Sequence, residues 1–256
     1  MTDADFTGRT ALVTGAASGI GAACAHWLDQ HGIAELILVD LDAASLESLQ
    51  LACKVRRFAG DVADPALWDG IENGFSRLDH AVINAGIANG CPLVDQDIGE
   101  WKRIYAVNVE GAFLALRTAL RIMKRQEDNT RSIVLTSSMT GVKPMPGTIA
   151  YGSSKAAVAH MARIAAAEHA KDHIRINAIA PGLVITPIWT KTSQFPQLVA
   201  RFGSREAAFK AMTERNSALG RLPTAEELAG QIGFLLSDQA WNITGAVLTS
   251  DGGDSL

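Results

Sequence analysis

Seven short β-prone apolar runs alternate with helix-length segments along this chain, and the alternation constrains the fold more than any other feature. The runs are "TALVT" ending at Thr14, "ELILVD" at Asp40, "KVRRF" at Phe58, "LDHAVIN" at Asn84, "SIVLTS" at Ser137, "IRINAI" at Ile179 and "AVLTS" at Ser250. Amphipathic segments between them include residues 20–31, 43–51, 65–75 and 100–125. Repeated strand–helix–strand units predict an α/β fold, with a parallel sheet covered by helices on both faces. Uniformly apolar runs such as "LILV" are typical of strands buried on both faces.

One region departs from this alternation. Between residue 186 and about residue 222 there is no strand pattern, and the segment contains Pro187, Pro196 and isolated aromatic residues. The chain of 256 residues is 48% hydrophobic, which is enough to bury one large core. We therefore expect a single domain over residues 1–256 with a small helical substrate lid at about 186–222.

Charge and composition argue against several classes of protein. The net charge is −4 and no block of like charges occurs, so nucleic-acid or anionic-membrane binding is not expected. The apolar runs are shorter than the ~20 residues that cross a bilayer, and "MTDADFTGRT" lacks the pattern of a secretory signal. Three widely spaced cysteines suggest neither a disulfide framework nor a metal site. We expect a cytoplasmic protein without a metal.

A glycine-rich stretch, "TGAASGIG" at residues 14–21, follows the first strand directly and opens the next helix. Glycines allow the backbone to approach a ligand, and the helix N-terminus presents free N–H groups to a diphosphate. Asp40 ends the second strand, 19 residues beyond Gly21, where a carboxylate can bind ribose hydroxyls. The alternatives are an ordinary tight turn for the glycines and a helix cap for Asp40.

Asp40 also bears on the choice between NAD and NADP. A carboxylate at the ribose 2′ position repels a 2′-phosphate. Leu41 follows it, and the glycine stretch contains no Arg or Lys that could pair with such a phosphate. The sequence therefore predicts NAD.

Three further residues suggest proton transfer. Tyr151 and Lys155 lie four residues apart on a helix, so they share one face, and Ser138 follows the fifth strand, where ligands bind in open parallel sheets. A free tyrosine has a pKa near 10, and a nearby ammonium lowers it. The set suits an alcohol whose oxygen is held by Ser138, whose proton goes to Tyr151 and whose hydride goes to a cofactor. The alternative is a surface Tyr–Lys pair without a role.

Together these pieces make the chain resemble a single-domain short-chain dehydrogenase/reductase over essentially its whole length. The matching motifs are "TGAASGIG", "DV" at 61–62, "NAG" at 84–86, Asn108 in "YAVNVEGAF", Ser138, "YGSSK" at 151–155, "NAIAPGLVITP" at 177–187 and "DGG" at 251–253. The resemblance implies a Rossmann-type, doubly wound parallel sheet of about seven strands and a nicotinamide cofactor.

The resemblance also implies roles for individual residues. It implies a catalytic tetrad of Asn108, Ser138, Tyr151 and Lys155, with Lys155 on the nicotinamide ribose and Asn108 holding a water in a proton relay. The residues expected at the cofactor are Gly15, Ser18, Gly19, Ile20, Gly21, Asp40, Leu41, Asp61, Val62, Asn84, Ala85, Gly86, Tyr151, Lys155, Pro181, Gly182, Val184 and Thr186.

The substrate is predicted to be a largely apolar secondary alcohol or ketone that is cyclic or bears a ring and carries little negative charge. The residues expected around it are Ser138, Met139, Thr140, Met145, Ile188 and Trp189. Phe195 and Phe209 in the lid could line the pocket or only pack the lid, and both readings stay open.

Two other functions are compatible with parts of the pattern. A 3-oxoacyl-thioester (acyl carrier protein) reductase would favour a basic residue in the glycine stretch and a basic surface. A non-catalytic cofactor-binding regulator would be expected to lack Tyr151 or Lys155, and both are present. The apolar circumference of residues 151–170 and 112–120, together with the resemblance, predicts a homotetramer.

Overall fold

The computed structural model describes residues 4–126, 131–190 and 195–256, without the side chains of Trp189 and Thr190. Seven parallel strands form one sheet in the order β3-β2-β1-β4-β5-β6-β7. They are β1 (Thr10–Thr14), β2 (Glu35–Asp40), β3 (Lys54–Ala59), β4 (His80–Ile83), β5 (Arg131–Thr136), β6 (Ile174–Pro181) and β7 (Val247–Ser250). Each overlaps one of the apolar runs, so the predicted parallel sheet of seven strands is confirmed.

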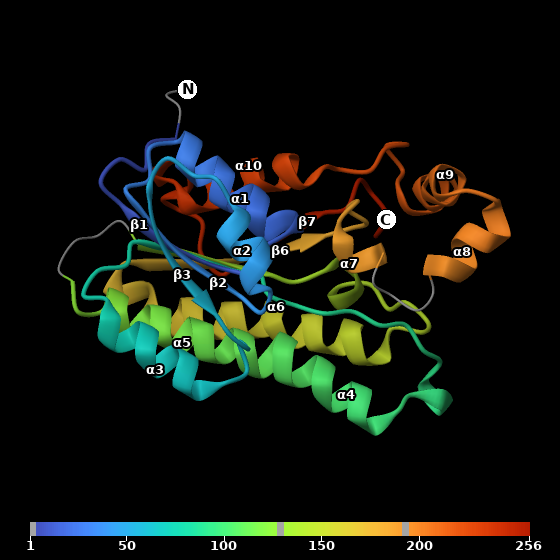
Figure 1. Ribbon diagram of the computed structural model, residues 1–256, viewed down its shortest axis with the longest axis horizontal. Coiled ribbons are helices and arrows are strands. Elements are labelled where there is room, and N and C mark those ends of the chain that lie inside the picture. The colour runs from blue at the N-terminus through green and yellow to red at the C-terminus, as the bar shows by residue number, and fades with distance from the viewer. Residues whose placement is uncertain (1–3, 127–130, 191–194) are drawn as a thin grey trace.

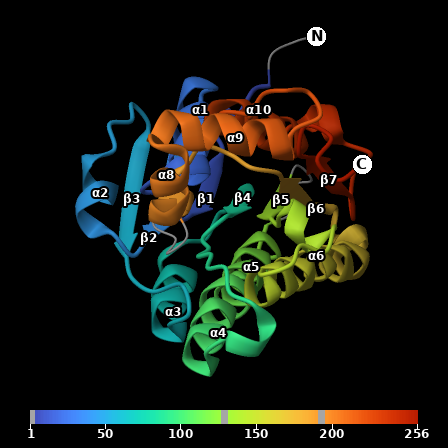
Figure 2. The ribbon, with the colours of Figure 1, turned by 90° about the vertical axis from the view of Figure 1, so that its right-hand side faces the viewer.

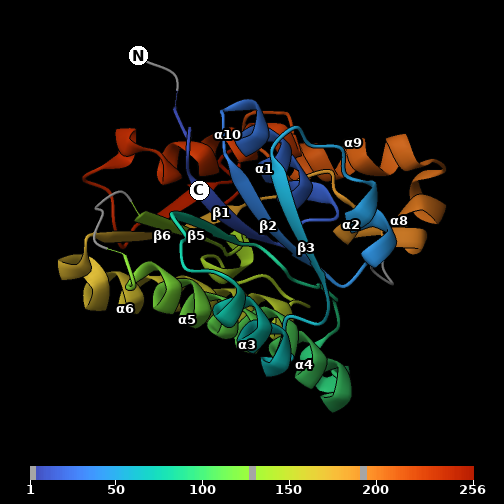
Figure 3. The same ribbon diagram turned by 60° about the vertical axis from the view of Figure 1, so that its left-hand side comes forward.

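Helices cover both faces of this sheet (Figure 1 and Figure 3). One face carries α3 (Pro65–Gly74), α4 (Ile98–Tyr105), α5 (Gly111–Met123) and α6 (Ile149–His169). The other carries α1 (Gly19–Gln30) and α10 (Ala225–Leu236), and α2 (Ala43–Ser48) lies beside β2 and β3. Alternate strand residues supply the two apolar layers: Leu12 packs toward the α5 side, whereas Ala11 and Val13 pack toward α1. The central strands β1, β4 and β5 are therefore buried on both faces, whereas the edge strands β3 and β7 are partly exposed.

The order of the strands creates a crevice at one edge of the sheet. β1 pairs with β2 on one side and with β4 on the other. The chain therefore winds from β1 through β2 to β3 and then crosses back to β4 on the opposite side of β1. In open parallel sheets ligands bind outside the carboxyl ends of the strands at such a switch point. The segments after β1 and β4, which hold the glycine stretch and "NAG", meet there.

The segment 100–125 is not the single regular helix that its amphipathic pattern suggests. α4 ends at Tyr105, a π-helical turn η2 covers Ala106–Glu110, and α5 begins at Gly111. π-turns insert one extra residue and occur frequently at functional sites. This one holds Asn108, whose side-chain amide bonds both the N–H and the carbonyl of Ile87, at 2.8 and 3.0 Å.

Between β6 and α10 the described residues form three helices: α7 (Pro187–Thr190), α8 (Phe195–Phe202) and α9 (Arg205–Asn216). α8 and α9 pack on each other beyond the strand ends (Figure 2). At the contact between α8 and α9 the ring centroids of Phe195 and Phe209 lie 5.3 Å apart, and the Arg205 guanidinium lies over both rings. Within the described part of the chain, none of the helices has the length and apolar character that crossing a membrane requires.

Candidate active site

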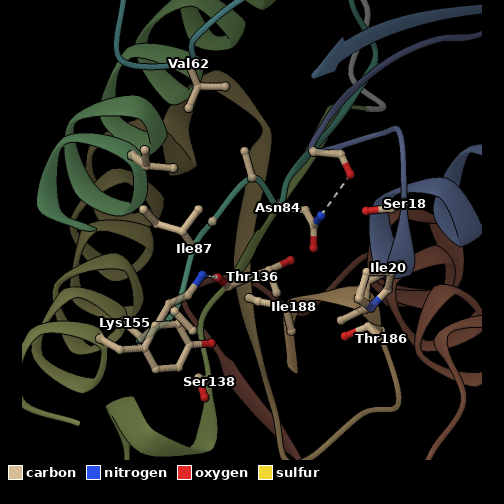
Figure 4. Close-up of a pocket in the computed structure, with 18 of the residues that line it drawn as sticks. Ser18, Ile20, Val62, Asn84, Ile87, Thr136, Ser138, Lys155, Thr186 and Ile188 are labelled. Atoms are coloured by element: carbon tan, nitrogen blue, oxygen red, sulfur yellow. Dashed lines mark hydrogen bonds between the residues drawn. The ribbon is translucent and has the colours of Figure 1, made fainter. Parts of the chain in front are cut away.

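A cavity of about 950 Å³ opens at the carboxyl edge of the sheet. Segments that follow β1, β2, β3, β4, β5 and β6 contribute to its wall, together with α6. Figure 4 shows Val62 at one end and Ser138 and Lys155 at the other, with Ser18 and Ile20 on the α1 side. The cavity therefore joins the glycine stretch to the Ser138–Tyr151–Lys155 group.

The glycine stretch packs against the "NAG" segment too closely for a side chain. A Cβ built at Gly15, where φ is +65°, would lie 2.9 Å from the Ala85 Cα. A Cβ at Gly21 would lie 2.0 Å from the Gly15 carbonyl oxygen, so the turn itself requires glycine at this position. Gly21 is not among the described residues that line the cavity. Thr14 completes the contact, since its Oγ1 accepts the N–H groups of Asn84 and Ala85 at 2.9 and 3.0 Å.

The first turn of α1 is suited to an anion. Among the described residues, the N-cap Ser18 makes no side-chain capping bond, and the first turn contains no acidic residue. Its N–H groups and the partial positive charge of the helix N-terminus therefore remain for a phosphate group. Ser18, Gly19 and Ile20 all line the cavity, as a diphosphate site requires.

Asp40 is not the cap of α2. That helix is capped by Asp42, whose carboxylate accepts the Ser45 N–H at 3.0 Å. Asp40 instead accepts the Ala17 N–H from the glycine stretch at 2.9 Å and the Asp42 N–H at 3.0 Å. Its carboxylate thus ties β2 to the glycine stretch, and the residue lines the cavity beside the exposed Leu41.

Lys155 lies at the other end of the cavity and is buried. Its Nζ donates to the Thr136 carbonyl oxygen at 2.8 Å and lies 5.8 Å from the centre of the Tyr151 ring. Burial lowers the pKa of Lys155 to about 8. Asn108 and Lys155 both lie close to Gly86. A Cβ built at Gly86 would lie 3.1 Å from the Lys155 Nζ and 3.2 Å from the Asn108 Oδ1.

Tyr151 and Ser138 both line this end of the cavity. Burial raises the pKa of Tyr151, and the nearby Ser138 hydroxyl opposes that rise. The sequence led us to expect a pKa lowered by Lys155. Within the protein alone burial has the larger effect, because the Lys155 ammonium is bonded to Thr136 rather than to the phenol.

Most of the residues expected from the sequence meet in this one cavity. Its described wall contains Gly15, Ser18, Gly19, Ile20, Asp40, Leu41, Asp61, Val62, Asn84, Ala85, Gly86, Ser138, Tyr151, Lys155, Pro181, Gly182, Val184, Thr186 and Ile188. Gly21 and Asn108 lie behind that wall, as described above.

The residues expected at the substrate are divided. Ile188 lines the cavity, whereas Met139 is buried beneath its described wall, Thr140 bonds the Ser138 Oγ at 3.0 Å and Met145 faces solvent. The side chain of Trp189 lies outside the described residues. Phe195 and Phe209 pack on each other rather than on the described cavity wall, which favours the packing reading for this pair.

Some wall residues were missed by the sequence reasoning. Ile87, Ala88 and Asn89 follow "NAG" directly, so their place after β4 was a usable signal. Glu100, Arg103 and Val107 come from α4 and the π-turn, and only the packing of these elements on α6 brings them to the cavity.

A doubly wound parallel sheet with a glycine-rich turn after β1, and with Ser138, Tyr151 and Lys155 at the same cavity, is typical of nicotinamide-dependent oxidoreductases. A family model described as enoyl-(acyl carrier protein) reductase matches residues 15–255. The chain belongs to the short-chain dehydrogenase/reductase family, whose similar members are dehydrogenases and reductases that interconvert alcohols and ketones.

Three relatives illustrate the range of that family. The chain is 37% identical to the cis-4-hydroxycyclohexanecarboxylate dehydrogenase of Sinomonas cyclohexanicum, covering 97% of both chains. It is 34% identical to the 3-oxoacyl-(acyl-carrier-protein) reductase of Thermotoga maritima, covering 96% of this chain and 97% of the relative. The crystal structure of L-sorbose reductase from Gluconobacter frateurii, complexed with NADPH and L-sorbose, superposes with a TM-score of 0.88 at 26% identity, covering 98% of both chains.

Proposed function

We propose that this protein is an NAD-dependent dehydrogenase that interconverts a secondary alcohol and a ketone. The observation that carries the proposal is that Ser138, Tyr151 and the buried Lys155 gather at one end of the cavity, opposite Val62. General acid–base catalysis on an alcohol requires a proton acceptor, an orienting hydroxyl and a positive charge around one small volume, and these three side chains could supply them.

The nicotinamide cofactor supplies the hydride acceptor and, when oxidised, a positive charge. Gly15, Ser18, Gly19 and Ile20 would hold its diphosphate, and Asp40 its adenosine ribose. Ser138 orients the alcohol oxygen, and Tyr151 accepts the hydroxyl proton. Tyr151 must be a phenolate to accept this proton, and Lys155 stabilises that phenolate electrostatically. Asn108, fixed by Ile87 and Ser154, serves the proton relay behind Lys155.

Preference for NAD over NADP is supported by the charges near Asp40. Asp40 and Asp42 are both acidic, Leu41 between them is apolar, and Gly60, whose N–H bonds the Asp40 carbonyl at 2.9 Å, is followed by Asp61. A 2′-phosphate at this place would meet carboxylates rather than an arginine. The structure of one relative is complexed with NADPH, so membership of the family does not decide between NAD and NADP. We therefore attribute the selection of NAD to the acidic residues around Asp40.

The substrate we propose is an apolar or cyclic secondary alcohol. Val184, Pro187 and Ile188 give the cavity an apolar side, and burying a ring there gains roughly 25 cal/mol per Å². The relationship to an enzyme named for a hydroxycyclohexane acid supports a ring. The helices α7–α9 would act as a lid over this part of the cavity, within a single domain.

The quaternary structure and location follow the same reasoning. We expect a cytoplasmic homotetramer, with no nucleic acid, membrane or metal partner. Phe113 on α5 and Ile164 on α6 are 48% and 47% exposed, which supports association through these helices.

The proposal is tested by turnover of ring-bearing secondary alcohols with NAD and with NADP, followed as NADH or NADPH absorbance. We expect turnover with NAD and a preference for it. One relative of this chain is named as a 3-oxoacyl-(acyl-carrier-protein) reductase. A 3-oxoacyl thioester with NADPH is therefore the comparison that the experiment must include. Faster turnover of that pair would replace the proposed function by the thioester reductase, and NADH binding without turnover of any substrate would favour a regulator.

A further inference from the structure

We propose that Lys143 is a positioning residue, which fixes Ser138 relative to the α7–α9 helices through the C-terminal segment 251–256. The structural part of this inference stands on contacts alone, and its kinetic consequence rests on the proposed function. Three sets of contacts support it, and they run from Ser138 to Lys143, from Lys143 to residues 251–256, and from these residues to α9 and the cavity wall.

The first set joins Ser138 to Lys143 through a stiff turn. Ser138 precedes the 3₁₀ turn η3 (Met139–Gly141), and its carbonyl accepts the Gly141 N–H at 2.9 Å. The N–H of Lys143 then bonds the Met139 carbonyl at 2.7 Å. At Gly141 a Cβ would lie 2.7 Å from the Ala156 nitrogen, so the turn is pressed against α6. A shift of Lys143 is therefore transmitted to Ser138.

The second set joins Lys143 to the C-terminal segment. The Lys143 Nζ donates to the main-chain carbonyl of Asp254 and lies 3.9 Å from its Oδ1. The Asp254 side chain is only 11% exposed, although burial disfavours its charge. The segment is shaped by Asp251, whose carboxylate accepts the Gly253 and Ser255 N–H groups at 3.0 and 2.8 Å. Asp254 is thus held in place for Lys143.

The third set joins the same segment to α9 and to the cavity. The Gly252 carbonyl accepts the Leu219 N–H at 3.0 Å, three residues after α9 ends. At Gly253 a Cβ would lie 2.9 Å from the Ala218 Cβ, which shows how closely the two segments pack. On the other side a Cβ built at Gly182, a residue of the cavity wall, would lie 2.8 Å from the Asp251 Cα. Both ribbon views place the C-terminus beside β7 (Figure 1 and Figure 2).

These contacts make the C-terminal segment a bridge between the two walls of the proposed alcohol site. Ser138 belongs to one wall, and Ile188 belongs to the other and lies on α7, the first of the helices α7–α9 that pack in series. Without the Lys143 contact the spacing of these walls is held less firmly, so the alcohol should bind more weakly. The glycine stretch and Asp40 lie at the far side of the cavity, and among the described residues none of their hydrogen bonds goes to this bridge, so cofactor binding should be kept.

Steady-state kinetics of three variants test the kinetic part. Lys143→Met removes the donor and keeps the length of the side chain, Lys143→Arg keeps donor and charge, and Lys171→Met removes an exposed charge elsewhere. With a ring-bearing secondary alcohol we expect Lys143→Met to raise the KM for the alcohol about fivefold, with kcat and the KM for NAD changed less than twofold. Lys143→Arg and Lys171→Met should match the parent. An unchanged alcohol KM in Lys143→Met would overturn the inference, as would an equal loss in NAD affinity.

Hydrogen exchange tests the bridge without any turnover. In Lys143→Met we expect faster amide exchange at residues 139–143 and also at 217–221, with the strands unchanged, and parental exchange in Lys143→Arg. Acceleration that stops at residues 139–143, or no acceleration, would show that the bridge does not couple the two walls. If the parent turns over no alcohol, the proposed function fails, and this measurement still decides the structural inference.

Discussion

The Lys155 Nζ lies 2.8 Å from the Thr136 carbonyl oxygen and 5.8 Å from the centre of the Tyr151 ring. Its charge is therefore anchored to the end of β5 and acts on the phenol through space. Lys155 therefore has two separate roles in the proposed chemistry. The bond to Thr136 fixes its position, and its charge near the Tyr151 ring influences proton transfer.

Replacing Tyr151 by phenylalanine should abolish turnover while NADH still binds. The ring and its packing are kept, and only the proton acceptor is lost, so kcat should fall about 10²-fold or more. Kinetics and NADH fluorescence titration measure the two effects. Tyr105→Phe is the matched control, because it removes the only other phenol, which bonds Ser153 at 3.0 Å. Activity of Tyr151→Phe within tenfold of the parent would assign the proton to another group.

Replacing Asp40 by alanine should narrow the preference for NAD. A hydrogen bond to a charged group contributes about 1.5–3 kcal/mol, so kcat/KM with NAD should fall about tenfold or more. The loss of the Ala17 contact at 2.9 Å should weaken binding of both cofactors as well. Asp64→Ala serves as control, since Asp64 caps α3 and is not part of the described cavity wall. An unchanged ratio of kcat/KM for NAD and NADP would remove Asp40 from the selection.

A methyl group at Gly86 should disturb the proton-transfer site. It would approach the Lys155 Nζ to 3.1 Å and the Asn108 Oδ1 to 3.2 Å, so both side chains must shift. Since small displacements of reacting groups are costly, we expect kcat/KM to fall about tenfold. Gly70→Ala is the control: in the described residues no atom lies within 4 Å of a Cβ there, and alanine in α3 should stabilise the protein by roughly 0.5–1 kcal/mol. Parental kinetics in Gly86→Ala would contradict the tight packing.

Burial of Lys155 should appear in the pH dependence of stability. The pKa of Lys155 is lowered to about 8 in the folded protein, whereas an unfolded lysine titrates near 10.4. Between these values the unfolded chain binds more protons, so this group's contribution to stability rises with pH. The parent should therefore gain about 3 kcal/mol relative to Lys155→Met between pH 8 and 10.5. Urea unfolding across this range measures the difference, and a constant difference would contradict the burial of a charged Lys155.

A charge placed on the exposed apolar side of α6 should disrupt the expected tetramer. Ile164 on α6 is 47% exposed, so Ile164→Glu should lower the mass measured by light scattering. Leu219→Glu, at a 76% exposed residue after α9, should leave the mass unchanged. A parent that is monomeric at micromolar concentration would refute the expectation.

Sequence alone was sufficient where the signal is local. The strands β1 and β2 end at Thr14 and Asp40 as expected, because runs that are apolar at every position can be buried only inside a covered sheet. The glycine stretch and the Tyr151–Lys155 pair could also be located, since a turn after a strand and an i, i+4 spacing on a helix depend on a few consecutive residues.

Tertiary structure decided everything that depends on which distant segments meet. The π-turn around Asn108 arises because its amide bonds Ile87, a residue 21 positions away, and no helical periodicity encodes that contact. The pKa of Tyr151 rises instead of falling, because burial and the partner of the Lys155 ammonium are properties of the packed site. The Lys143–Asp254 contact joins residues 111 positions apart. A local pattern predicts an element and its chemistry, whereas distances, burial and long-range partners exist only once the elements have packed.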